Sequence, residues 1–178
     1  MSYGVQTLVI VGVGLMGASF AMALKRARLV ARVVGVDHSE QVLTEALARG
    51  VIDCGCQDVR QAVNGADMVV LATPVGQLAA ILQAVRPALN PSTIISDLSS
   101  TKANVAALLR QYLPGHLSYC LPTHPMAGSE RSGVAAAQDN LFQRRSVVLT
   151  PLPETHDVVK AQVSALWSGL GAKIYIMD

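Results

Sequence analysis

Short apolar runs alternate with amphipathic stretches along the whole chain. Runs typical of β-strands lie at residues 8–11, 33–37, 51–54, 67–72, 93–96, 118–121, 146–150 and 172–177. The intervening stretches, with their capping residues, predict helices from residue 15 onward and at residues 39–49, 58–64, 73–85, 101–112 and 155–170. This alternation predicts a doubly wound, mainly parallel α/β sheet with helices on both faces.

The first two runs enclose a dinucleotide-binding signature. Gly12-Val13-Gly14-Leu15-Met16-Gly17 follows the first strand and opens a helix, and Asp37 ends the second strand, 20 residues after Gly17 (37 − 17 = 20). In a Rossmann-type fold Gly12 permits the tight turn, Gly14 lets the backbone approach a pyrophosphate, and Gly17 lets the helix pack on the strand. The N–H groups at the start of the helix, around Leu15 and Met16, then face the phosphates.

The acidic residue indicates which coenzyme fits. A carboxylate at Asp37 accepts hydrogen bonds from the adenosine ribose hydroxyls and repels a 2′-phosphate. The sequence therefore predicts that the chain binds NAD rather than NADP.

Three other interpretations compete for these residues. Residues 4–24 carry no charge and are long enough to span a bilayer, but they contain the three glycines. Gly12 and Gly17 also have the spacing of a phosphate loop, but Ala18-Ser19 replaces the residues that hold the terminal phosphates and magnesium. Glycines that only permit close packing would leave Asp37 unexplained. We therefore expect neither a membrane protein nor a nucleoside triphosphatase.

Composition narrows the class of partner. With 178 residues, 15% of them charged and 4% aromatic, the chain is expected to form one domain with an aliphatic interior. A net charge of +2, with no Lys/Arg run longer than two, argues against nucleic acid and leaves a small molecule as the expected ligand. Cys54, Cys56 and Cys120 form an odd set without a secretory signal, which predicts free thiols in the cytoplasm. No second pair of ligands accompanies Cys54-x-Cys56, so no metal site is expected.

Ligands of open α/β sheets bind beyond the carboxyl ends of the strands. Four segments occupy such positions: the glycine loop, Thr73-Pro74-Val75, residues 97–102 and residues 122–130. The last contains His124, followed six residues later by Glu130. An imidazole at a strand end is a plausible proton acceptor near neutral pH. The other histidines, His38, His116 and His156, are expected to face solvent.

The chain resembles the prephenate and arogenate dehydrogenases of tyrosine biosynthesis. The segment His124-Pro-Met-Ala-Gly-Ser-Glu-Arg-Ser-Gly133 is similar to that family's signature, and Asp97-x-x-Ser100-x-Lys102 matches a second motif. The resemblance extends from the glycine loop to the last predicted strand. It implies oxidative decarboxylation, in which NAD+ takes a hydride from the substrate ring, carbon dioxide leaves and the ring becomes aromatic.

The resemblance also implies roles for particular residues. His124 would accept the hydroxyl proton of the substrate, with a core or turn histidine held by backbone carbonyls as the structural alternative. Ser100 would orient His124 and approach the nicotinamide, or simply cap the helix expected from residue 101. Glu130 would order the substrate entrance, or be a surface carboxylate. Lys102 belongs to the second motif, but a Lys in the first helical turn opposes the helix dipole, so solvent exposure is the alternative and its role stays open. Thr73, Pro74 and Val75 would line the nicotinamide ribose, although a plain strand-to-helix turn explains them nearly as well.

Members of this family carry a helical domain after the nucleotide domain, which forms a homodimer and supplies contacts to the substrate carboxylates. Residues 1–178 have no room for it, so we expect this chain to be the NAD-binding domain and poorly active alone. Two other functions stay open: a non-catalytic NAD-binding module, and a reductase like the β-hydroxyacid dehydrogenases. The sequence does not separate prephenate from arogenate as substrate.

Overall fold

Strands and helices alternate along the chain in the computed structural model, which describes residues 4–128 and 130–177. In chain order the elements are β1 Val5–Val11, α1 Leu15–Arg26, β2 Val30–Val36, α2 Glu40–Ala48, β3 Cys54–Cys56, α3 Val59–Val63, β4 Met68–Leu71, α4 Val75–Val85, β5 Ile94–Asp97, α5 Lys102–Tyr112, β6 Thr123–Pro125, β7 Ser146–Leu149, α6 Asp157–Gly169 and β8 Lys173–Ile176. Short 3-10 helices lie at Arg86–Ala88 (η1), Leu117–Tyr119 (η2) and Val134–Ala136 (η3).

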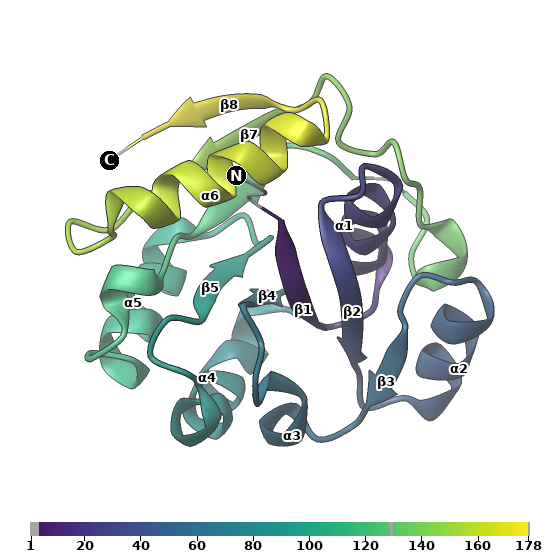
Figure 1. The fold of residues 1–178 in the computed structure, drawn as a ribbon, viewed down its shortest axis with the longest axis horizontal. Helices are drawn as coiled ribbons and strands as arrows, with labels where there is room; N and C mark the ends of the chain where they lie inside the picture. Colours follow the sequence, from purple (N-terminus) through teal and green to yellow (C-terminus); the bar gives the residue numbers. More distant parts are fainter. Residues whose placement is uncertain (1–3, 129, 178) are drawn as a thin grey trace.

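Five strands form a parallel central sheet in the order β3-β2-β1-β4-β5. A smaller sheet, β6-β7-β8, adjoins it at the β5 edge, with β6 antiparallel to β7 and β7 parallel to β8. Figure 1 shows the smaller sheet lying with α6 on one side of the central sheet. The predicted fold class, an α/β sheet wound in two directions from β1, is confirmed.

Two hydrophobic cores lie on opposite faces of the central sheet. In β1 the side chains alternate, with Leu8 and Ile10 in one core and Val9 and Val11 in the other. The first core includes buried residues of α1, α2 and α6, and the second those of α3, α4 and α5. Strands covered on both faces have to be apolar throughout, which explains the uninterrupted runs in the sequence.

The third strand begins later than its apolar run predicts. Val51 and Ile52 are buried, but their N–H groups point back to the carbonyl of Ala46 at the end of α2. They therefore close the turn after α2, and pairing with β2 starts only at Cys54. The expected strand at residues 51–54 is corrected to Cys54–Cys56.

The sixth strand was also wrongly placed. Residues 118–121 do not form a strand: Leu117–Tyr119 is the 3-10 helix η2, and Cys120 makes a single bridge to Ile95. Pro122 has no N–H to continue a ladder with β5. The strand forms instead at Thr123–Pro125 and pairs with β7.

The charge-free stretch at residues 4–24 divides into β1, the glycine loop and part of α1. Within residues 4–128 and 130–177, no helix has both the length and the apolar character that crossing a bilayer requires.

Candidate functional site

The glycine loop joins β1 to α1, and two of its three glycines leave no room for a side chain, whereas the third faces open space. Gly12 has φ +97°, and a Cβ there would lie 2.8 Å from Cγ2 of Thr73. A Cβ on Gly17 would lie 2.2 Å from the carbonyl oxygen of Gly12. At Gly14 a Cβ would meet no described atom within 4 Å, because the backbone there faces open space. A ligand can therefore approach the backbone at Gly14, as the spacing predicts.

The amino end of α1 faces the same space. Gly14 occupies its N-cap position without a capping side chain, and Leu15 and Met16 begin the helix. The first N–H groups of a helix have no partner within it, so they are free to bind an anion. The first turn, residues 15–18, carries no acidic side chain that would compete for this role.

Asp37 connects the end of β2 to the glycine loop. Its Oδ2 accepts a hydrogen bond from the N–H of Val13 at 3.1 Å, and its Oδ1 accepts one from the N–H of Ser39 at 3.0 Å. The side chain is 14% exposed. Two backbone donors thus fix the carboxylate at the mouth of the loop while leaving lone pairs for hydroxyl groups of a ligand.

A cavity of about 200 Å³ lies between the glycine loop and the ends of β2 and β4. Its lining residues include Gly12, Asp37, Thr73, Val36, Val59 and Ile81. The hydroxyl of Thr73 is buried and makes no hydrogen bond to any part of the chain that the structure describes. Since a buried hydroxyl without a partner is unfavourable, this atom suits a polar ligand in the cavity.

The turn after β4 carries the other two residues predicted to line the coenzyme. α4 begins at Val75, two residues later than expected, so Pro74 occupies its N-cap position and not its first turn. Pro74 is exposed and Val75 is half-buried. Their contact with a ribose stays a prediction.

His124 lies inside β6 rather than in a loop after a strand. It is half-buried and pairs with Val148 of β7. The preceding residues run beside β5: the N–H of Leu121 donates to the carbonyl of Ile95 at 2.9 Å, and the N–H of Thr123 donates to Oδ1 of Asp97 at 3.1 Å. His124 therefore lies at the edge where β5 ends, the same edge that carries the glycine loop.

A buried ion pair lies beside His124, and it was not predicted from the sequence. Asp97 is 1% exposed and forms an ion pair with Nζ of Lys102, whose side chain is 15% exposed. Lys102 also donates to the carbonyl of Thr123 at 2.7 Å. The alternative that Lys102 sits in solvent is therefore wrong. Desolvation lowers the pKa of Lys102, and the attraction of Asp97 opposes this shift.

A visible signal for this pair existed in the sequence. Asp97 ends a strand and Lys102 stands five residues later, in the first turn of the next helix. A cation placed against the helix dipole is unfavourable unless a nearby carboxylate holds it.

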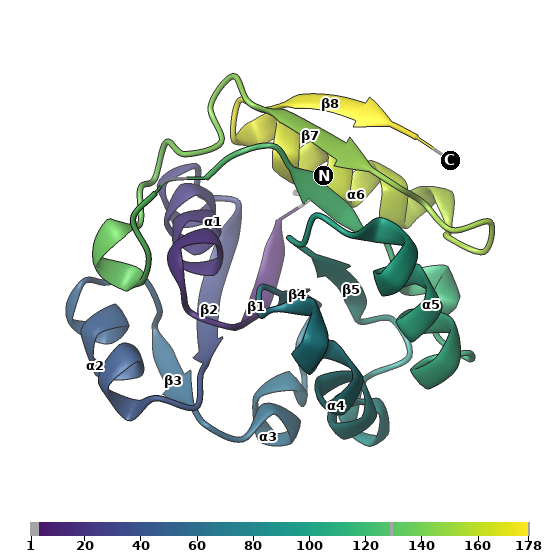
Figure 2. The same ribbon diagram turned by 180° about the vertical axis from the view of Figure 1, so that it is seen from behind.

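The two other predicted catalytic residues lie on exposed segments. Ser100 is exposed between β5 and α5. The alternative that it caps a helix is wrong, because α5 begins at Lys102 and its N-cap is Thr101. Glu130 is exposed in the loop after β6, next to Ser129, which is outside the described residues. Figure 2 shows this loop, in green, passing α1 toward α2. The proposed roles of Ser100 and Glu130 stay predictions.

The remaining histidines differ in their surroundings. His38 has a 95% exposed side chain, as expected, with its Nδ1 3.3 Å from Oδ1 of Asp37. His156 is also exposed. His116 is half-buried, and its Nε2 lies 2.6 Å from the carbonyl oxygen of Thr93, so the expectation that it faces solvent is wrong.

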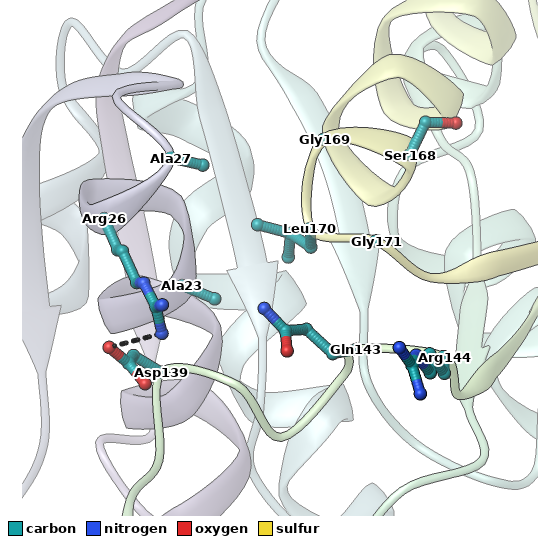
Figure 3. Close-up of a pocket in the computed structure, with 10 residues that line it drawn as sticks. All are labelled: Ala23, Arg26, Ala27, Asp139, Gln143, Arg144, Ser168, Gly169, Leu170 and Gly171. Carbon is teal, nitrogen blue, oxygen red and sulfur yellow. Dashed lines mark ion pairs between the residues drawn. The ribbon is translucent and has the colours of Figure 1, made fainter.

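A larger cavity, of about 530 Å³, lies at the other end of α1. Figure 3 shows Arg26 there pointing to Asp139, with which it forms an ion pair at 3.0 Å. α1 has 12 residues, so this cavity is about 18 Å from the glycine loop along the helix axis. This cavity is the larger of the two, but it lies too far from the carboxyl edge of the sheet to belong to the same site.

Residues 20–176 match the family model described as prephenate dehydrogenase, nucleotide-binding domain. The chain is 36% identical over 171 residues to the cyclohexadienyl dehydrogenase of Zymomonas mobilis, covering 96% of this chain and 58% of that protein. A solved prephenate dehydrogenase from Aquifex aeolicus, in complex with hydroxyphenyl propionate and NAD+, superposes with a TM-score of 0.86 at 28% identity, covering 97% of this chain and 60% of that chain. The arogenate dehydrogenase of Synechocystis gives a TM-score of 0.88 at 31% identity, covering 97% and 59%.

The chain spans about half the length of the curated relatives it matches, between 46% and 58%. The stretch of this chain that matches the Zymomonas mobilis protein, 96% of its length, includes the glycine loop and the His124 segment.

Proposed function

This chain belongs to the prephenate dehydrogenase family, of which it contains the nucleotide-binding domain, and we propose that it binds NAD in an enzyme that oxidatively decarboxylates prephenate or arogenate. The observation that carries the proposal is the common location of two groups of residues. The glycine loop with Asp37 and the strand with His124 both lie at the carboxyl edge of the parallel sheet. Coenzyme and proton acceptor can therefore serve the same substrate.

Three features support NAD as the coenzyme. The open backbone at Gly14 and the amino end of α1 suit a pyrophosphate. The fixed carboxylate of Asp37 suits the ribose hydroxyls and disfavours a 2′-phosphate. Thr73, whose buried hydroxyl has no partner among the described residues, lines the same cavity and supports a polar ligand there.

Bound NAD+ would supply the hydride acceptor for the ring carbon that carries the substrate hydroxyl. His124 would accept the proton of that hydroxyl, a role that requires a neutral imidazole. Ser100 would orient the imidazole, and Glu130 would order the substrate entrance. As the bond to the ring carboxylate breaks, carbon dioxide leaves and its electron pair completes the aromatic ring, which makes the reaction favourable. The residues mainly position the reactants, an effect that can contribute about 7 to 11 kcal/mol.

We further propose that the relatives' additional length corresponds to a second domain, which completes the substrate site and forms a homodimer. Directly opposed residues of neighbouring strands share one face, so His124, Val148 and Tyr175 line the same face of the smaller sheet. Tyr175 is 51% exposed there, and Met126, two residues after His124, is 55% exposed. A partly apolar face beside the proton acceptor suits a domain that closes over the substrate.

The three free cysteines fit a reducing cytoplasm.

Calorimetric titration with NAD and NADP, followed by assays with prephenate and with arogenate, tests the proposal. The chain should bind NAD more tightly than NADP. The complete enzyme should reduce NAD+ with one or both substrates and release carbon dioxide. NAD binding without turnover of either substrate by the complete enzyme would instead favour a non-catalytic module.

A further inference from the structure

β5 and the segment that leads into β6 lie side by side, and their backbone hydrogen bonding stops near Asp97. Beyond that point side chains connect the two segments. The last backbone bond runs from the N–H of Leu121 to the carbonyl of Ile95. Beyond it, Oγ of Ser96 donates to the carbonyl of Leu121 at 2.8 Å, and Oγ1 of Thr123 donates to the carbonyl of Asp97 at 2.5 Å. The start of β6 is therefore held to β5 mainly by side chains.

Asp97 is the centre of this bridge. Oδ1 accepts from the N–H of Thr123, and Oδ2 accepts from the N–H and the hydroxyl of Ser99 and from Nζ of Lys102. A carboxylate as deeply buried as this one, at 1% exposure, requires donors on both oxygens and a nearby positive charge. Asp97 thus depends on Lys102 for its charge to be tolerated.

Lys102 uses its donors within the bridge. An ammonium group has three N–H donors, and three acceptors lie around Nζ: Asp97, the carbonyl of Thr123 at 2.7 Å and the hydroxyl of Ser99 at 3.4 Å. These contacts occupy the donors that a substrate carboxylate would need. Lys102 is therefore poorly suited to bind substrate directly.

Together, Asp97 and Lys102 hold every hydrogen-bonding group of Thr123. Asp97 accepts from its N–H and its hydroxyl, and Lys102 donates to its carbonyl. His124 is the next residue, joined on its other side to β7 through the pairing with Val148. The peptide group between Thr123 and His124 is thus fixed by Lys102 at its oxygen.

We propose that Lys102 is a positioning residue, which fixes the orientation of His124 toward the substrate by holding the Thr123 carbonyl and neutralising Asp97. The inference rests on the proposed function and deepens it. Misplacing a catalytic group by about 1 Å can reduce a rate by up to about 100-fold. Lys102 should therefore affect the rate of the chemical step and leave coenzyme binding intact.

The test compares Lys102→Met, Lys102→Arg and His124→Asn with the double variant Lys102→Met/His124→Asn in the complete enzyme. Rates are expressed per NAD-binding site, so that loss of folded protein does not count as loss of activity. Lys160→Met is a matched control, because Lys160 forms an exposed pair with Asp157 on α6. A further variant, Asp97→Asn/Lys102→Met, avoids leaving a buried carboxylate without its cation.

Lys102→Met and Asp97→Asn/Lys102→Met should lower kcat by about 10- to 100-fold, with the Kd for NAD and the KM for substrate within about twofold of wild type. Lys102→Arg should retain more activity than Lys102→Met, because a guanidinium can donate to both the Asp97 carboxylate and the Thr123 carbonyl. Added to His124→Asn, Lys102→Met should cause little further loss, because both changes act on the same step.

Additive losses in the double variant would overturn the inference, since they would mean that Lys102 acts independently of His124. Full kcat in the folded Asp97→Asn/Lys102→Met variant would also overturn it. Inactivity of the wild-type enzyme toward prephenate and arogenate is a different outcome, which counts against the proposed function. In that case hydrogen exchange tests the bridge: the amides of Thr123, His124 and Met126 should exchange faster in Lys102→Met than in Lys160→Met, and equal rates would refute it.

Discussion

Two regions at the same edge of the sheet are built in contrasting ways. The coenzyme region, residues 5–37, is one strand-turn-helix-strand unit, with no room for a side chain at Gly12 and Gly17 and open space at Gly14. The His124 region depends on charged and hydroxyl side chains from two strands and a helix, with Thr123 bonded to Asp97 across 26 positions of sequence. A local unit can be recognised from spacing, whereas a region assembled from distant segments can be understood only when they are brought together.

The two regions also use ion pairs differently. Lys25 of the coenzyme region pairs with Asp53, which lies just before β3, and the two side chains are 29% and 38% exposed. Lys102 and Asp97 are 15% and 1% exposed. Because solvent screens the first pair and not the second, their loss should have unequal effects.

The largest expected effect comes from removing the proton acceptor. His124→Asn in the complete enzyme should lower kcat by about 100- to 10,000-fold, the usual contribution of a general base. The Kd for NAD should stay unchanged, because His124 lies outside the glycine loop. Steady-state rates and calorimetric titration measure both quantities. Loss of NAD binding would contradict the separation of coenzyme binding from proton transfer, and it would assign His124 a structural role.

The glycine loop should separate folding from coenzyme binding. Gly17→Ala places a methyl group 2.2 Å from a backbone oxygen and should destabilise the fold by about 3 kcal/mol. Gly14→Ala is the matched control, since its methyl group meets open space and should change stability by about 1 kcal/mol or less. Its effect should instead be weaker NAD binding. Urea denaturation and titration of both variants check this, and equal stability losses would contradict the steric assignment.

Asp37→Asn should weaken NAD binding by about 1.5 to 3 kcal/mol, the range for hydrogen bonds to a charged group, and should reduce the preference for NAD over NADP. The matched control is Asp139→Asn, which removes an exposed partner of Arg26 at the far end of α1. Titration of both coenzymes into both variants is the measurement. An unchanged ratio of NAD to NADP affinity in Asp37→Asn would mean that the Asp37 carboxylate does not discriminate between the two coenzymes.

The smallest effect concerns the exposed pair of the coenzyme region. Burial raises the pKa of Asp53, but the hydrogen bonds from Lys25 and Val33 and the positive charge of Lys25 lower it by more, so the pKa lies below its ordinary 3.8. The stability that Asp53 contributes is therefore present above the ordinary carboxyl pKa and is lost as the pH falls through the lower folded value.

Asp53→Asn should consequently cost about 1 kcal/mol or less at pH 7, and this difference from wild type should shrink below pH 4. Denaturation midpoints at the two pH values measure it. A difference that grows on acidification would contradict the sign of the shift.

Most of the architecture could be predicted because its signals are local. The strands β1, β2, β4, β5, β7 and β8 overlap the predicted apolar runs, and Ser39 begins the predicted second helix as its cap, its Oγ accepting from the N–H of Val42. The two misplaced strands, β3 and β6, are short and lie where pairing is decided by distant residues. An apolar run is buried either way, so hydrophobicity alone did not separate Val51 and Ile52 in a turn from residues in a strand.

The sequence by itself predicted the coenzyme region. The spacing from Gly12 to Asp37 sets the turn, the helix and the position of the carboxylate, because residues this close in sequence are brought together by local structure. It also identified His124 as the residue to test. Only the tertiary structure decided that His124 lies in a strand and that Lys102 is buried against Asp97. That contact is possible because β5 and β6 separate after Pro122, and such a separation depends on how two sheets pack rather than on any local pattern.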